Sequence, residues 1–138
     1  MFCNRRIMIC ASVLGIALSL TGCKKVITST VYLNNATTNV TILSVAATAG
    51  PVTYVYNGNL LPLGGTAGPT KVQSLSHKGD QFPITGTITA SVGGVTTVFP
   101  IPTIINNFHI GRTNTITITG TYITGAPGEI MAVNVDTP

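Results

Sequence analysis

Phe82-Pro83-Ile84-Thr85-Gly86-Thr87-Ile88-Thr89-Ala90-Ser91-Val92 alternates apolar and hydroxyl side chains along most of its length. In an extended strand successive side chains point to opposite faces, so this period of two predicts a strand with one buried and one hydrated face. The expected buried side chains are Phe82, Ile84, Ile88, Ala90 and Val92. The segment therefore decides the fold class in favour of β-sheet.

A tight turn follows this strand. Val92-Gly93-Gly94-Val95 is typical of a two-residue β-hairpin, because glycines adopt the positive φ that such turns need. The return strand, residues 95–101, would place Val95, Thr97, Phe99 and Ile101 on one side. Pro100 lacks an N–H group, so this strand is expected to end at a sheet edge.

Period-two runs continue on both sides of the hairpin. The expected strands are residues 26–33, 40–46, 52–56, 59–63, 82–92, 95–101, 113–123 and 130–135, with short ones at 71–76 and 108–110. Their half-buried alternation favours two sheets packed face to face. We expect an all-β domain, a single antiparallel β-sandwich of about seven to nine strands, with a small barrel as the alternative.

Two segments predict reversals of the chain. Asn57-Gly58 favours a type I′ turn that would pair residues 52–56 with residues 59–63. Residues 62–70 hold three glycines and two prolines, a composition that disfavours regular elements. We expect this segment to be the main loop of the domain.

The N-terminus has the layout of a secretory signal. Arg5 and Arg6 precede an uncharged, largely apolar run, residues 7–20, that is short for a membrane span. The run ends in Leu20-Thr21-Gly22-Cys23, which resembles the lipobox of bacterial lipoproteins. This resemblance implies that residues 1–22 are a lipoprotein signal peptide, cleaved between Gly22 and Cys23, and that the Cys23 thiol is acylated.

Acylated Cys23 would anchor the mature chain to a membrane, because two or more acyl chains give lasting attachment. Residues 23–25 would form a lipidated tether with Lys24 and Lys25 near anionic headgroups, and residues 26–138 the β-sandwich domain. Cys3 and Cys10 leave with the signal. The domain is therefore expected to fold without a disulfide or a cysteine-ligated metal.

Composition disfavours several functional classes. Charged residues make up 7% of the chain, against roughly 25% in ordinary soluble domains. The basic residues beyond the tether, Lys71, Lys78 and Arg112, are scattered, so we expect no nucleic-acid partner. With three acidic residues in all, catalysis by paired carboxylates is disfavoured, and we expect neither an enzyme nor a cofactor.

Few residues suggest chemistry. Ser76, His77 and Asp80 share a polar turn, but neighbouring residues rarely align a nucleophile, a base and an orienting acid, so a solvated turn is expected. His109 would need further ligands to hold a metal, and we expect a structural or edge-facing histidine and no metal. The threonine-rich faces are interpreted as hydrated strand surfaces, with contact to carbohydrate or another subunit as the alternative.

Residues 107–120, Asn-Phe-His-Ile-Gly-Arg-Thr-Asn-Thr-Ile-Thr-Ile-Thr-Gly, resemble the late strand of Bacteroidetes fimbrillins, where an Arg-Asn or Asn-His stretch opens a Val/Thr-alternating run. The resemblance implies a transthyretin-like, immunoglobulin-like sandwich with an acylated cysteine. Polymerising members are similar in being cut after an arginine downstream of the lipid, whereas here no arginine lies between Cys23 and Arg112. A truncated, accessory or tip-like relative fits this departure.

Two functional hypotheses follow. The first is a lipid-anchored structural and interaction protein of the cell envelope, on the bacterial outer membrane or cell surface. It would be a fimbrillin-like or adhesin module that associates with protein partners through sheet edges, with residues 26–33 or 130–135 as the exchanging strands. The alternative is an outer-membrane lipoprotein that binds a small ligand or glycan in the loop at residues 62–70.

Mass spectrometry of the N-terminal peptide from membranes should find a chain that begins at diacylated or triacylated Cys23. Cys23→Ser should yield soluble or unprocessed protein, because the acylated thiol is lost. An unmodified Cys23, or a mature chain that begins elsewhere, would contradict the lipidation hypothesis.

Overall fold

The structure, a computed structural model, describes residues 25–102, 104–122 and 132–138. The predicted signal peptide, the Gly22–Cys23 cleavage site and the acylated Cys23 lie outside this part of the chain. None of the described residues belongs to a helix long and apolar enough to cross a membrane. The strands are β1 (Val26–Thr37), β2 (Thr41–Ala49), β3 (Val52–Leu60), β4 (Gly65–Leu75), β5 (Gln81–Phe82), β6 (Thr85–Val92), β7 (Val95–Pro100), β8 (Phe108–His109), β9 (Thr113–Gly120) and β10 (Ala132–Asp136).

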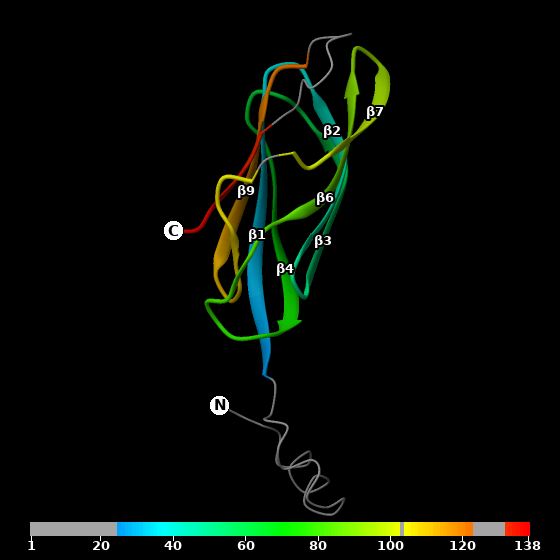
Figure 1. Cartoon of the computed structure of the whole chain (residues 1–138). Helices are drawn as coiled ribbons and strands as arrows, with labels where there is room; N and C mark the ends of the chain where they lie inside the picture. The colour runs from blue at the N-terminus through cyan, green and yellow to red at the C-terminus, as the bar shows by residue number, and fades with distance from the viewer. Residues whose placement is uncertain (1–24, 103, 123–131) are drawn as a thin grey trace, which may run out of the picture.

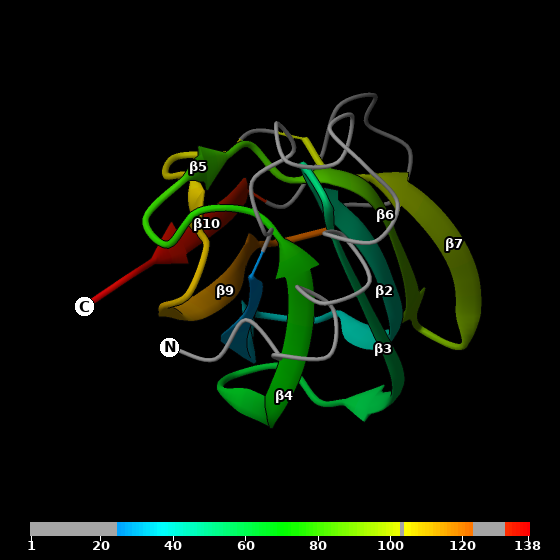
Figure 2. The same cartoon turned by 90° about the horizontal axis from the view of Figure 1, so that it is seen from below.

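Two four-stranded sheets face each other. Sheet A has the order β10-β9-β1-β4, and sheet B has the order β3-β2-β6-β7. Figure 2 shows them as two layers, with β4 and β3 at neighbouring edges. The short strands β5 and β8 form a separate ribbon. The predicted all-β sandwich is confirmed.

β1 is one of the two inner strands of sheet A, beside β9. It pairs antiparallel with β4 along one side and parallel with β9 along the other. The parallel direction arises because the chain turns at Gly111 and starts β9 beside the first half of β1, where Thr30 N donates to Arg112 O at 3.0 Å. The alternation of buried and exposed side chains is the same in parallel and antiparallel strands. The sequence pattern therefore could not predict that β1 and β9 pair in parallel.

β1 is also longer than the predicted strand, which stopped before Asn34-Asn35. The Asn35 side chain is fully buried, and its Nδ2 donates to Val40 O and to Leu60 O, each at 2.8 Å. Thr37 Oγ1 donates to Asn35 Oδ1 at 2.6 Å. Asparagine favours turns when its amide bonds the local backbone, whereas here Nδ2 bonds carbonyls beyond its own strand and only Oδ1 bonds locally, to Thr37.

The predicted hairpin at Asn57-Gly58 is wrong. β3 continues through both residues, with a register shift after Asn57, and pairs with β2 as far as Leu60, opposite Ile42. The chain reverses afterwards, where Leu63 and Gly64 have φ of 62° and 105° and donate from their N–H groups to Thr37 O and Asn35 O. The tertiary hydrogen bonds to β1 thus override the local turn signal.

The predicted main loop, residues 62–70, is also wrong over most of its length. Its second half belongs to β4, which pairs with β1 from Gly65 onward. Gly68-Pro69 lies opposite the register shift between Val31 and Leu33. Bulges are where sheets tolerate glycine and proline, which explains how this composition fits inside a strand.

The deciding segment behaves as expected on its two faces, although it divides at Pro83-Ile84 into β5 and β6. Ile84, Ile88 and Ala90 are buried, while the intervening Thr85 and Thr87 are exposed. The Gly93-Gly94 hairpin is confirmed by the pairing of Val92 with Val95. The largest fully buried side chains are Phe108, Leu33, Ile42, Ile84, Ile88, Ile110, Ile116, Ile118, Val31, Val40, Val45 and Val52.

Ile88→Asp should unfold or strongly destabilise the domain, because it places an unpaired carboxylate in the core at a cost of about 3 kcal/mol or more. Thr87→Asp is the matched control, since the same charge one residue away faces water. Urea unfolding followed by far-UV circular dichroism measures both free energies of unfolding. Equal destabilisation by the two variants would contradict the assignment of faces.

Candidate interaction edge and polar cleft

The two sheets leave four edge strands, β4 and β10 in sheet A and β3 and β7 in sheet B. β3 and β4 lie side by side and close one flank of the sandwich (Figure 2). The outer side of β10 is occupied in part, since Ile104 bridges Val133 and Ile105 N donates to Val133 O at 3.2 Å. β7 pairs with β6 alone among the described strands.

The unpaired side of β7 carries backbone groups that point away from the domain. Ile101 N donates to Gly86 O at 2.9 Å, so the odd-numbered residues here turn their backbone groups toward β6. Because these groups alternate along a strand, the N–H and C=O of Thr96 and Val98 point outward. No described residue of the chain hydrogen-bonds these groups.

The side chains of β7 add apolar surface to this edge. Val95 and Val98 are 66% and 60% exposed, and Phe99 is buried. Phe99 packs edge-on against Tyr122 with ring centroids 5.6 Å apart. Val95 shares its side of β7 with Phe99, but it lies next to the hairpin turn, where it remains largely in solvent.

Sheet B has no charged side chain in any of its strands. Natural proteins usually block an open edge with lysine, an inward-pointing charge, a bulge or proline. In β7, proline occurs only as the last residue, Pro100. We name residues 95–100 the β7 edge, and it has the features of a strand that can accept a partner.

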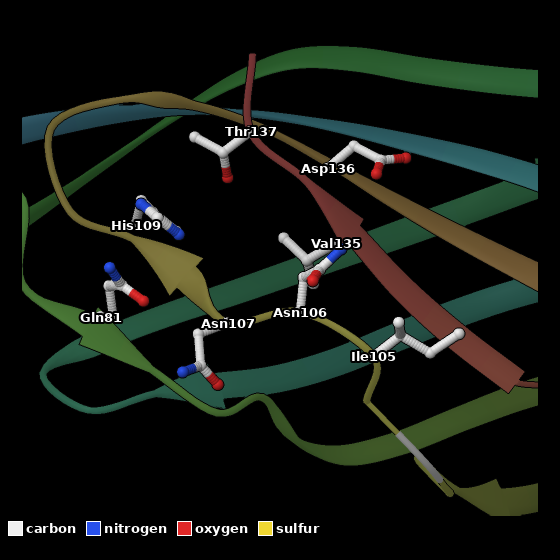
Figure 3. Close-up of a pocket in the computed structure, with 8 residues that line it drawn as sticks. All are labelled: Gln81, Ile105, Asn106, Asn107, His109, Val135, Asp136 and Thr137. Carbon is white, nitrogen blue, oxygen red and sulfur yellow. The ribbon is translucent and has the colours of Figure 1, made fainter.

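A polar cleft of about 390 Å³ lies on the other flank, between β10 and the β5–β8 ribbon. Figure 3 shows side chains from β5, β8, β10 and the segment before β8 around it. Its lining residues are Gln81, Ile105, Asn106, Asn107, His109, Val135, Asp136 and Thr137. Amide, imidazole and hydroxyl groups dominate, so the cleft suits a small neutral ligand that forms many hydrogen bonds.

The buried amide of Asn114 connects two residues that line the polar cleft, His109 and Thr137. Its Oδ1 accepts from His109 N at 2.8 Å and from Thr137 Oγ1 at 3.2 Å. Its Nδ2 donates to His109 O at 2.9 Å. The expectation of a structural or edge-facing His109 agrees with this position on a short, partly buried strand.

A hydrogen-bond chain orders the opposite rim. Asn106 Nδ2 donates to Asn134 Oδ1 at 3.0 Å, and Asn134 Nδ2 donates to the Asp136 carboxylate at 3.2 Å. Sequence reasoning treated Asn106-Asn107 as a turn and missed the site, because its members come from three distant segments. The abundance of amides near residues 106–114 was the only available signal.

Ser76, His77 and Asp80 come together, but as a turn. Ser76 Oγ and His77 N both donate to Asp80 Oδ2, at 2.7 and 3.1 Å, and these hydrogen bonds lower the pKa of the Asp80 carboxyl. The His77 side chain is 94% exposed, with Nδ1 3.6 Å from the same oxygen. Serine bonds the carboxylate rather than the imidazole, so the catalytic order Ser–His–Asp is not formed.

Tyr54 and residues 62–70 do not line the polar cleft. Tyr54 is buried in β3, and burial raises the pKa of its phenol to about 12. In the described part of the chain no three His, Cys, Asp or Glu side chains gather as metal ligands. The ligand loop expected at residues 62–70 is largely β4, so that site assignment is not supported.

Comparison of the chain with protein families, with curated proteins and with solved structures finds no match.

Asn114→Ala should lower the free energy of unfolding by about 1–3 kcal/mol, because His109 N and O would lose a buried partner. Asn107→Ala, which removes an exposed amide from the same cleft, should change it by less than about 0.5 kcal/mol. Denaturant unfolding midpoints compare the two. Similar stability of both variants would show that Asn114 does not hold the cleft.

Proposed function

We propose that this protein is a lipid-anchored structural and interaction module of the bacterial cell envelope, fimbrillin-like or adhesin-type, that joins another protein chain by strand addition at the β7 edge. The observation that carries the proposal is an open strand with outward backbone groups and no charge. The membrane attachment rests on the lipobox-like Leu20-Thr21-Gly22-Cys23. The outer membrane or the cell surface is the proposed location.

Strand addition explains why the features of the β7 edge occur together. Main-chain hydrogen bonds supply affinity in this binding mode, and alternate side chains supply selectivity. A strand added beside β7 would extend sheet B and cover the exposed Val98. The proposed partner is an extended segment rich in β-branched residues, which matches an uncharged surface without desolvating ions.

The β7 edge replaces the chain ends as the proposed exchanging strand. Residues 26–33 belong to β1, which has a neighbour on each side, so its release would break two ladders. Residues 132–135 lie in the edge strand β10, but Ile104 and Ile105 already cover part of its outer side. The β7 edge needs no strand to leave the domain.

A second candidate function is the binding of a small neutral ligand or a glycan in the polar cleft. The favouring observation is the set of ordered amides and one carboxylate around about 390 Å³ of space. Its described lining residues include no Phe, Tyr or Trp ring for a sugar to stack on. We therefore rank this candidate below strand addition.

Val98→Pro should abolish association with sister or partner subunits. Proline removes an outward N–H that the β6–β7 ladder does not use, and edge positions of this kind tolerate it. Val98→Thr is the matched control, since threonine keeps both the N–H and the β-branched shape. The measurement is the size of assemblies extracted from membranes, resolved on gels without boiling.

A melting temperature within a few degrees of wild type for Val98→Pro would show that the domain stays folded. Assembly of the proline variant at wild-type size would overturn the role of the β7 edge. In that case the polar cleft becomes the leading site.

A further inference from the structure

One end of the sandwich combines basic and apolar groups. We call it the basal end and define it by Lys25, Val26, Leu75 and Lys78. Figure 1 shows that β1 begins and β4 finishes at this end, whereas the β6–β7 hairpin lies at the opposite end of the long axis. All four residues are exposed.

Pairings and close contacts hold these residues together. Val26 pairs directly with Leu75 across the β1–β4 ladder. Gly111 packs so closely between Ile27 and Lys78 that an added Cβ would lie 2.9 Å from either side chain. Gly79 N, in the turn that carries Lys78, donates to Ile110 O at 2.9 Å. This hydrogen bond fixes the turn to the segment between β8 and β9.

The apolar part of the basal end is a shallow, open depression. Val26, Pro51, Gln73, Ser74 and Leu75 line a cavity of about 470 Å³ that is open to solvent. Val26 and Leu75 are 52% and 55% exposed. Ser74 Oγ is buried and has no hydrogen-bond partner within the described residues.

The charge of the basal end is positive. Lys25 and Lys78 belong to it. Arg112 lies just before β9, where its backbone oxygen accepts a hydrogen bond from Thr30 N. Within the described segments no lysine or arginine lies within 4.0 Å of a carboxylate. Asp80 accepts hydrogen bonds from Ser76 and His77, and Asp136 lies on the polar cleft.

We propose that the basal end docks on the surface of an anionic lipid bilayer, with Val26 and Leu75 among the headgroups and Lys25 and Lys78 paired with lipid phosphates. This inference rests on the proposed acylation of Cys23. Cys23 precedes Lys25 by two residues, so the chain between them spans at most about 7 Å. The basal end must then lie at the membrane surface, where its cations meet the negative potential of anionic lipids.

Docking fixes the direction of the long axis. The β6–β7 hairpin would point away from the membrane and present the β7 edge to solvent (Figure 1). A domain attached by its acyl chains alone would instead tumble about its tether. The docked domain and the tumbling domain differ in the average distance between the basal end and the lipid headgroups.

The test uses membrane-anchored protein in vesicles, with a fluorophore on Leu75→Cys or, at the opposite end, on Val95→Cys. A spin-labelled headgroup lipid quenches fluorophores near the surface. We expect strong quenching of the residue 75 label in phosphatidylcholine vesicles that contain about one third phosphatidylglycerol, and roughly half as much without the anionic lipid. The residue 95 label should be quenched weakly in both.

Lys78→Gln should reduce the extra quenching in anionic vesicles, since each basic residue near the surface strengthens the attraction about fivefold. Thr96→Glu lowers the net charge by the same amount as Lys78→Gln, but it lies in β7, at the end opposite the basal end. It should therefore leave the quenching of the residue 75 label unchanged. Equal quenching of the residue 75 label in both kinds of vesicle, or equal effects of the two variants, would overturn docking.

The proposed anchor is checked separately in the same samples, by mass spectrometry of the acylated N-terminal peptide. Acylated protein with lipid-independent quenching would reject docking alone. Protein that is not acylated would reject the proposed anchor, and docking with it, because docking assumes that anchor. Neither result depends on strand addition at the β7 edge.

Discussion

The rest of the structure depends on the buried amide of Asn35, which connects the two sheets. It lies near the end of β1, one of the two inner strands of sheet A, and donates to carbonyls at Val40 and Leu60. Leu60 ends β3 of sheet B, so one side chain ties the two layers together. A buried amide without partners would cost about 1–3 kcal/mol, which makes this arrangement strongly position-specific.

The alternation of apolar and polar residues predicts which face of a strand is buried better than it predicts which strands pair. Ile84, Ile88 and Ala90 are buried as the period of two requires, since burial depends on the local direction of each side chain. Pairing depends on distant contacts. Asn57-Gly58 has the local chemistry of a turn, yet β3 continues through it because β2 offers a ladder as far as Ile42. Gly68-Pro69 fits within β4 because these two residues form a bulge opposite Tyr32 of β1.

The candidate sites differ in how far the sequence could predict them. The lack of charge in residues 95–100 is readable from the sequence, but their place at an open edge follows from the strand order. The polar cleft was not predictable, because Gln81, Asn107 and Asp136 belong to separate segments that meet only after folding. Neither site follows from a local motif.

In the described chain β3 and β4 lie against each other and Ile104 covers part of β10, so β7 is the edge strand with no described neighbour on its outer side, and the number of such edges limits how many partners can join. A subunit that polymerises by strand pairing needs one surface to receive a neighbour and a second to offer to the next. A module with a single receptive edge ends the growth of a polymer wherever it joins, or closes on one partner as a symmetric pair. Under the proposed strand addition, a chain with the β7 edge as its one receptive edge therefore acts as a terminator or a pairwise connector and not as a repeating shaft unit.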